Sequence, residues 1–252
     1  MPQQPIGVFG GTFDPIHVGH LRTAHELMTA LRLAEVRFVP CRLPPHRPPA
    51  VAPAALRLRM LEAALEGLPG FRADGRELRR PGLSYMVDTL ASLREEVDDR
   101  PLCLLLGLDA FLGLPTWHRW RDIPDLAHVV VARPPGVAQP VDGAAGELLR
   151  SRGTTNPVDL AKAPAGRVLL RDVTQLEISS SAIRTLVAAG GDPRFLVPDA
   201  VLEERLVQRN AALAHASLGL LRALAEEEIA HLAVHVGLVE EGREPSVQQQ
   251  SD

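Results

Sequence analysis

The amino-acid sequence predicts a doubly wound, Rossmann-like α/β fold, with helices on both faces of a parallel sheet and a C-terminal helical extension. Short apolar runs alternate along the chain with longer segments of helical periodicity, which is the order of elements in a parallel sheet. Runs such as "PLCLLLG" (101–107) are apolar without interruption, as expected for strands buried on both faces. The 252 residues suffice for an enzyme domain with an appendage.

The individual elements follow from the same two patterns. Strands are expected at 6–10, 36–40, 101–107, 128–133 and 167–173. Helices are expected at 20–33, 55–68 and 85–97. Two proline-rich segments, 40–53 and 133–143, directly follow strands. We therefore expect them at the edge of the sheet where doubly wound folds bind ligands, with ordinary surface loops as the alternative.

The chain divides into three regions. Residues 1–209 carry the α/β pattern, residues 210–240 form the helical extension, and residues 241–252 are a polar tail that is expected to be disordered. Apolar residues recur at three- and four-residue steps from Leu218 to Val236, beside a charged face. This apolar stripe fits packing on the chain's own domain, and a contact within a homo-oligomer is the alternative.

Composition limits the partners that the protein can have. Lys and Arg number 27 against 31 Asp and Glu, a net charge of −4 that favours neither nucleic acid nor an anionic membrane. No stretch reaches the roughly 18 apolar residues of a membrane span, and no signal-peptide pattern opens the chain, so a cytoplasmic protein is expected. Cys41 and Cys103 lie in apolar runs without metal-ligand spacing, which predicts buried free thiols.

The stretch "GVFGGTFDPIHVGHL" (7–21) is the first candidate site. Gly10 and Gly11 fall at the end of the first expected strand, where a missing Cβ lets the backbone approach a ligand closely. The free N–H groups at the start of the following helix favour an anion. His17 and His20, three residues apart, project from the same side of the first helical turn.

The two histidines are not predicted to bind a metal. Zinc helices carry histidines four apart around a catalytic Glu, and no Cys or carboxylate stands close enough in sequence here to complete a ligand set. Gly19 leaves one face of the turn bare, so that a flat or bulky group could lie against it. A structural or solvent-facing histidine pair is the alternative to an anion site.

The segment "EISSSAIR" (177–184) is the second candidate site. Three serines that open a helix offer hydroxyl groups and free N–H groups, and Arg184 adds a guanidinium that can grip a phosphate with two hydrogen bonds. A serine-rich helix cap with a purely structural role is the alternative.

These two segments resemble the two signatures of the HxGH nucleotidyltransferase superfamily, whose members transfer a nucleotidyl group from a nucleoside triphosphate to a phosphate or similar acceptor. The segments between them narrow the resemblance to the bacterial nicotinate-nucleotide adenylyltransferases, over residues 6–207. Those segments are "PPHRP" (44–48), "RELRRPGLSYMVDTL" (76–90), "LLGLDAFLGLPTWHRW" (105–120), "VVARPPG" (130–136) and, after the second signature, "LVPDAVLEERL" (196–206).

The resemblance implies a nucleotidyltransferase domain over residues 1–209 and a reaction of NAD biosynthesis. ATP and nicotinate mononucleotide would give nicotinate adenine dinucleotide and pyrophosphate, with Mg²⁺ bound together with ATP. No protein nucleophile is needed, because the acceptor's phosphate attacks the α-phosphorus of ATP directly. Catalysis then depends on positioning two anionic reactants and on neutralising charge.

The same resemblance implies roles for individual residues. Catalysis at the ATP phosphates is expected of His17, His20 and Arg184. Contacts with ATP are expected of Gly10, Gly11, Thr12, Phe13, His20, Gly107, Asp109, Ser180, Ser181 and Arg184. Contacts with the mononucleotide are expected of His46, Arg47, Tyr85, Met86, Trp117 and Arg133. The indole of Trp117 suits stacking on a pyridine ring.

Two positions depart from the family pattern. Met86 stands where relatives usually have Thr, and His118 where they usually have Tyr. Preference for the acid over the amide therefore depends on whether backbone N–H groups or side-chain hydroxyls bind the nicotinate carboxylate. Nicotinamide mononucleotide and phosphopantetheine are the alternative acceptors. A catalytically silent nucleotide-binding regulator is the alternative outside enzymes, whereas a synthetase that charges RNA would need a second synthetase signature and basic charge.

Overall fold

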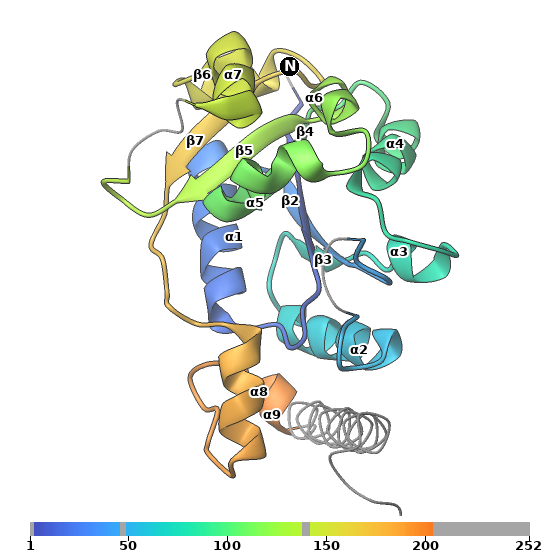
Figure 1. Ribbon diagram of the computed structural model, residues 1–252, viewed down its shortest axis with the longest axis vertical. Helices are drawn as coiled ribbons and strands as arrows, with labels where there is room; N and C mark the ends of the chain where they lie inside the picture. Colours follow the sequence, from blue (N-terminus) through green and yellow to red (C-terminus); the bar gives the residue numbers. More distant parts are fainter. Residues whose placement is uncertain (1–2, 46–48, 138–141, 204–252) are drawn as a thin grey trace, which may run out of the picture.

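A parallel sheet organises the chain. A computed structural model describes residues 3–45, 49–137 and 142–203. Within them, seven strands pair in the order β3-β2-β1-β4-β5-β7-β6, and every pairing is parallel (Figure 1). The strands are β1 (Ile6–Gly11), β2 (Glu35–Pro40), β3 (Phe71–Ala73), β4 (Leu102–Gly107), β5 (His128–Arg133), β6 (Gly153–Thr154) and β7 (Val168–Asp172).

Helices connect the strands. The α-helices are α1 (Val18–Leu31), α2 (Ala54–Leu65), α3 (Arg76–Arg79), α4 (Met86–Val97), α5 (Leu108–Gly113), α6 (Ile123–Leu126), α7 (Gly143–Arg152), α8 (Ser180–Ala188) and α9 (Asp199–Glu203). Three short 3₁₀ helices are η1 (Leu114–Thr116), η2 (Trp120–Asp122) and η3 (Pro157–Ala161). Figure 1 shows α8 and α9 together at the end of the molecule where α1 begins.

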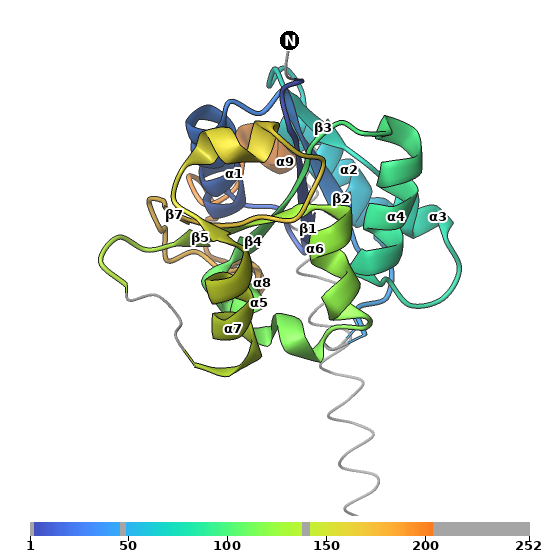
Figure 2. The ribbon, with the colours of Figure 1, turned by 90° about the horizontal axis from the view of Figure 1, so that it is seen from above.

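The sheet separates two hydrophobic cores, because successive side chains along each strand point to opposite faces of the sheet. Along β4, Cys103 and Leu105 face the core under α1 and α2, whereas Leu104 and Leu106 face the core under α4 and α5. Seen from above, α1 and α4 lie on opposite sides of the sheet (Figure 2). The predicted arrangement, a parallel sheet with helices on both faces, is confirmed.

The strand order reverses between β1 and β4. From β1 the chain proceeds to β2 and β3 on one side, whereas β4, β5 and β7 extend the sheet on the other. A crevice opens at such a reversal, outside the carboxyl ends of the two strands, because their connections leave in opposite directions. The ends of β1, at Gly10 and Gly11, and of β4, at Gly107, meet there.

The predicted elements are present, with ends that differ by a few residues. The helix predicted at 20–33 spans 18–31, because His17 is its N-cap and Arg32 ends it in a left-handed conformation, with φ 51°. The helix predicted at 55–68 ends at Leu65, since Gly67 turns the chain with φ +70°.

Several short elements were not predicted. They include β3, α3 and α5, which are only three, four and six residues long and too short to show a period. The prediction of a buried thiol is right for Cys103, which is fully buried, and wrong for Cys41, which is half-buried. Cys41 follows the last residue of β2, so it lies at the edge of the sheet and not inside it.

Residues 204–252 lie outside the described part of the chain, so the predicted extension at 210–240 and the tail at 241–252 stay predictions. None of the helices that the structure describes is both long and apolar enough to cross a membrane.

Truncation of Leu104 should test the core beneath α4. Leu104 is fully buried in the centre of the sheet, so Leu104→Ala should lower the free energy of unfolding by about 2–5 kcal/mol, measured by urea denaturation. The matched control is Leu112→Ala on α5, where the leucine is 49% exposed and the cost should stay within about 0.5 kcal/mol. Equal losses in the two variants would contradict the assignment of Leu104 to this core.

Candidate active site

The turn after β1 is held in a defined shape. Phe13 has φ 48°, a left-handed conformation that is rare for a bulky residue, and the Asp14–Pro15 peptide is cis. The Asp14 carboxylate is buried and accepts hydrogen bonds from the N–H groups of Val51 (2.8 Å) and Ala52 (3.2 Å). The residues just before α2 therefore fix this turn from one side.

The segment "EISSSAIR" fixes the same turn from another side. Ser179 caps α8 by accepting a hydrogen bond from the Ala182 N–H at 3.1 Å. The Ser180 hydroxyl donates to the carbonyl of Pro15 at 2.9 Å. Arg184 donates to the carbonyl of Asp14, and its guanidinium lies 3.7 Å from the Asp14 carboxylate. The two predicted signatures, far apart in the chain, are thus in direct contact.

Ser181 completes this group. Its hydroxyl is exposed and lies 3.4 Å from Nη2 of Arg184. Because one guanidinium carries five N–H donors, Arg184 can hold the turn and still bind an anion.

His17 and His20 lie face to face at the start of α1. Their ring centroids are 3.6 Å apart and the rings are inclined by 29°. The backbone N–H of His17 donates to Nδ1 of His20 at 3.3 Å, so a neutral His20 carries its proton on Nε2. Nδ1 of His17 is buried without a hydrogen-bond partner among the described residues.

Both imidazoles are neutral at physiological pH in the free protein. Burial lowers the pKa of His17 to about 4. Burial also lowers the pKa of His20, and the nearby His17 adds to this effect, because two stacked imidazolium ions would repel each other. Anionic phosphates bound beside the pair would raise both pKa values again.

Gly19 lines the α1 cavity, so a flat or bulky group against this face of the turn stays a prediction. A Cβ at Gly19 would lie 3.1 Å from Nδ1 of His17, so the glycine also allows the His17 ring to fold over the helix start.

The first of two cavities at the crevice lies in front of α4, and we call it the α4 cavity. Its volume is about 290 Å³. It is lined by Phe9, Gly10, Gly11, Thr12, Cys41, Pro44, Pro45, Glu77, Ser84, Tyr85, Met86, Leu105, Leu106, Gly107, Asp109, Ala110, Gly113, Thr116, Trp117 and His118. Most of the wall is apolar or aromatic, as in pockets for flat heteroaromatic ligands.

The second cavity lies in front of α1, and we call it the α1 cavity. Its volume is about 320 Å³. It is lined by Phe9, His17, Gly19, His20, Thr23, Gly107, Leu108, Asp109, Ala132, Pro134, Val137, Val173, Gln175 and Leu176. The two cavities share Phe9, Gly107 and Asp109, so two ligands bound in them would meet at the ends of β1 and β4.

Aromatic side chains form the mouth of the α4 cavity. The rings of Tyr85 and His118 stack with centroids 4.3 Å apart, and Trp117 lies beside them, half-buried. The methyl end of Met86 occupies the space that a Cβ on Gly10 would need. Met86 therefore packs on the strand end, and its backbone N–H opens α4, which has no side-chain N-cap.

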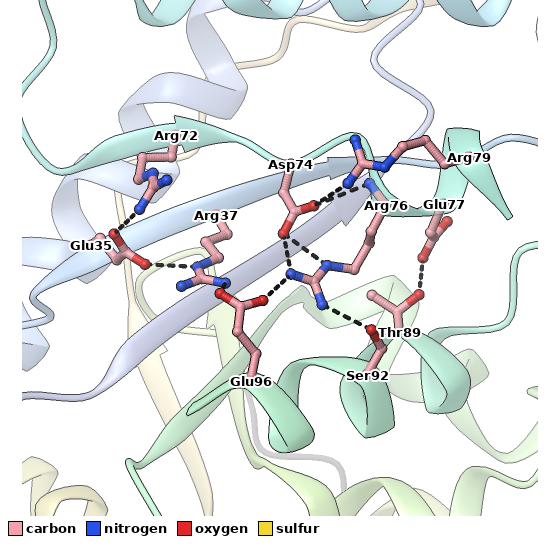
Figure 3. A network of polar contacts seen from close by, with 10 residues as sticks. All are labelled: Glu35, Arg37, Arg72, Asp74, Arg76, Glu77, Arg79, Thr89, Ser92 and Glu96. Atoms are coloured by element: carbon pink, nitrogen blue, oxygen red, sulfur yellow. Dashed lines mark hydrogen bonds and ion pairs between the residues drawn. The ribbon is translucent and has the colours of Figure 1, made fainter. Parts of the chain in front are cut away.

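Glu77 is a buried carboxylate in the wall of the α4 cavity that sequence reasoning missed. It lies on α3 and accepts a hydrogen bond from the Thr89 hydroxyl of α4 at 2.5 Å (Figure 3). Burial raises the pKa of Glu77, although the hydroxyls of Thr89 and Ser84 and the charge of Arg80 oppose this shift. This carboxylate ties α3 to the start of α4.

A network of ion pairs holds the far end of α4. Glu96 of α4 contacts Arg37 of β2 at 2.7 Å and Arg76 of α3 at 2.6 Å, and Nε of Arg76 donates to Asp74 at 2.8 Å (Figure 3). Ionised partners on three elements therefore fix the angle at which α4 meets the cavity.

Three residues expected at the mononucleotide are not seen in the α4 cavity for two different reasons. His46 and Arg47 lie outside the described residues, so their contacts with the mononucleotide stay predictions. Arg133 lines neither cavity, and its Nε donates to Asp172 at 2.6 Å. Successive side chains of a strand point to opposite faces of the sheet. Because the neighbouring Ala132 faces the α1 cavity, the side chain of Arg133 points to the other face.

The described residues contain no group of three His, Cys, Asp or Glu side chains that could hold a metal ion. Asp109 is the one described carboxylate that lines both cavities, and it is exposed.

Sequence comparisons identify relatives over most of the chain. The cytidylyltransferase-like family matches residues 8–186. A probable nicotinate-nucleotide adenylyltransferase of Methylococcus capsulatus is 50% identical over 210 residues, which are 83% of this chain and 99% of that protein. A protein of the same description from Halorhodospira halophila is 46% identical over 208 residues, covering 82% and 94% of the two chains.

Solved structures show the same fold. A nicotinic acid mononucleotide adenylyltransferase of Plasmodium falciparum, complexed with NaAD, matches with a TM-score of 0.59 and 15% identity over 81% of this chain and 97% of that chain. A putative nicotinate-nucleotide adenylyltransferase of Vibrio parahaemolyticus matches with a TM-score of 0.54 and 15% identity over 81% and 99%.

The lowered pKa of His17 predicts a pH dependence of stability. Between its ordinary value of 6.5 and about 4, His17 takes up a proton in the unfolded chain but not in the folded one. The free energy of unfolding should therefore fall by up to about 3 kcal/mol as the pH is lowered through this window. His17→Gln should lose this part of the slope, whereas His25→Gln, at an exposed position on α1, should keep it. Identical slopes in urea denaturation of the two variants would show that His17 does not titrate in this way.

Proposed function

This chain belongs to the cytidylyltransferase-like family and, within it, to the nicotinate-nucleotide adenylyltransferases, and we propose that its two adjoining cavities bind the two substrates of that reaction. The enzyme transfers the adenylyl group of ATP to the phosphate of nicotinate mononucleotide, a step of NAD biosynthesis. We place ATP in the α1 cavity and the mononucleotide in the α4 cavity. The observation that carries this assignment is that both cavities share Phe9, Gly107 and Asp109 at the crevice.

The geometry suits in-line transfer. An acceptor phosphate at the end of the α4 cavity would face the α-phosphorus of an ATP bound beside His17 and His20. The attacking oxygen forms the new P–O bond as the bond to pyrophosphate breaks, and no enzyme side chain becomes bonded to phosphorus. Holding the two reactants in this orientation supplies much of the catalysis.

The two histidines act on the phosphates in this proposal. Nε2 of His20 carries the proton when the ring is neutral, so it can donate to a phosphoryl oxygen on which charge builds up. His17 also lines the α1 cavity, so its ring would stand beside the same group of oxygens. The site is apolar around them, with Phe13 only 5.2 Å from the His20 ring, and this strengthens each hydrogen bond.

The start of α8 binds the leaving group in this proposal. Ser180 and Arg184 are held against the turn at Asp14 and Pro15, which leads into the helix that carries the histidines. Ser181 is exposed next to Arg184. A guanidinium and hydroxyls at this point suit the β- and γ-phosphates.

Mg²⁺ fits this site as a companion of ATP. The ion prefers oxygen ligands, keeps several waters and commonly takes substrate phosphates as ligands, so the single shared carboxylate of Asp109 does not exclude it. Bound with the triphosphate, it would neutralise part of the phosphate charge. Asp109 would alternatively accept hydrogen bonds from the ribose hydroxyls.

The start of α4 is suited to the nicotinate carboxylate. The helix is 12 residues long and its first N–H groups, from Met86 onward, have no side-chain cap. Backbone N–H groups do not depend on the side chain at position 86, so Met86 in place of Thr is compatible with an acid substrate. Trp117 would stack on the pyridine ring and His118 would close the mouth over it.

We place the enzyme in the cytoplasm on the strength of its family, with ATP and nicotinate mononucleotide as partners. Assembly into a homo-oligomer stays a prediction, since the stripe from Leu218 to Val236 lies outside the described residues.

A panel of acceptors should test the substrate assignment. With ATP and Mg²⁺, pyrophosphate release should be fastest with nicotinate mononucleotide, slower with nicotinamide mononucleotide and absent with phosphopantetheine. A faster rate with phosphopantetheine would refute the assignment, and ATP binding without turnover of any acceptor would favour the silent regulator.

Removal of the His20 imidazole should test its role at the phosphates. His20→Ala should lower kcat/KM by roughly 100- to 1,000-fold, because a preorganised donor to the transition state is lost, while circular dichroism stays unchanged. His25→Ala on the same helix is the control and should retain full activity. Near-normal turnover of His20→Ala would remove this residue from the proposed mechanism.

A further inference from the structure

Arg57 is a charged residue in an apolar setting. It lies on α2 and is only 1% exposed. The residues that follow it on the same helix face are Met60, Leu61 and Ala64, all of them buried in the core beneath α1 and α2. The guanidinium of Arg57 lies beneath the turn that follows β1, where it contacts Thr12. Arg57 lines neither of the two cavities.

The partners of Arg57 are two backbone carbonyls. Nη1 donates to the carbonyl of Thr12 at 2.7 Å, and Nε donates to the carbonyl of Ala52 at 3.1 Å. Among the residues that the structure describes, no carboxylate forms an ion pair with it. A buried cation without a counter-ion is costly, and a methionine of similar length would fill the same space without that cost. Its place beneath the turn suggests a function beyond packing.

The bond to Thr12 determines the orientation of one peptide group. The Thr12–Phe13 peptide is trans, so its C=O and its N–H point in opposite directions. With the Thr12 carbonyl directed at Arg57, the N–H of Phe13 is directed away from α2. Phe13 itself has a left-handed φ of 48°. No described residue accepts a hydrogen bond from this N–H, although Phe13 itself is buried.

We propose that Arg57 is a positioning residue for adenylyl transfer, which holds the Thr12–Phe13 peptide so that the N–H of Phe13 is presented to a phosphate oxygen at the junction of the two cavities. Thr12 lines the α4 cavity, and the ring of Phe13 contacts His20, which lines the α1 cavity. The nature of the phosphate rests on the proposed function. The positive charge behind the peptide also strengthens its dipole toward an anion.

Kinetics of three variants should test this inference. Arg57→Met removes both hydrogen bonds at nearly constant volume, Arg57→Lys keeps the charge and one bond, and Arg59→Met changes an exposed arginine of the same helix. We expect kcat to fall roughly 100-fold in Arg57→Met and roughly 10-fold in Arg57→Lys, and to stay within about twofold in Arg59→Met. Rates are normalised to the folded fraction, measured by circular dichroism and thermal unfolding.

A role in folding alone would give a different result. In that case Arg57→Met would lower the melting temperature while kcat per folded molecule stayed at the wild-type value, and this outcome would overturn the proposal. If Arg57→Met does not fold, Arg57→Lys decides, since a wild-type kcat in that variant would equally overturn it. Separate KM values for ATP and for nicotinate mononucleotide show which substrate supplies the phosphate.

A second measurement does not depend on turnover. In the wild-type protein the ¹⁵N–¹H signal of Phe13 should shift on addition of ATP or of nicotinate mononucleotide, and the shift should be smaller in Arg57→Lys. A Phe13 signal that responds to neither substrate would refute the proposal for Arg57. If the wild-type protein showed this shift, reduced in Arg57→Lys, but turned over no acceptor, the proposed function would fail, whereas Arg57 would still position the N–H of Phe13 toward a phosphate.

Discussion

The structure depends on one short turn, from Thr12 to His17, and on the hydrogen bonds that hold it. Arg57 binds its carbonyl at Thr12, the backbone before α2 binds the Asp14 carboxylate, and α8 binds the carbonyls of Asp14 and Pro15. Two segments far apart in the chain, residues 51–57 and 180–184, therefore converge on a few peptide groups. Because the turn leads directly into α1, its shape determines where both histidines stand.

Burial sets the chemistry of those histidines. An imidazole with a pKa of about 4 is neutral at physiological pH, so His17 carries no charge in the free protein. Arg57 lies beneath the turn with two carbonyl groups as partners, whereas Arg184 binds the carbonyl of Asp14 and lies 3.7 Å from the Asp14 carboxylate. In the proposed function, the anionic phosphates of the substrates bring further negative charge to these groups.

The α4 cavity, where we propose that the acceptor binds, is built differently. Aromatic rings line it at the open start of α4, and two carboxylates hold that helix in place. Glu77 anchors the beginning of α4 through Thr89, and Glu96 anchors its end through Arg37 and Arg76. Charged groups therefore position α4, while the N–H groups at its start and the aromatic side chains stay available to bind a ligand.

The sequence by itself determined the order of strands and helices, the parallel sheet and the two signature segments, because these follow from local periodicity and from short motifs. It also predicted site roles for Gly10, His17, His20 and Trp117, which line the two cavities. The tertiary structure decided that Arg133 turns to Asp172, and that Cys41 and Glu77 line the α4 cavity. It also decided that Arg57 lies beneath the turn after β1. In the sequence, the one sign that Arg57 has a special role is a charged residue at position 57 among the apolar residues of one helix face. Its partner at Thr12 is 45 residues away, and only the folded chain brings the two together.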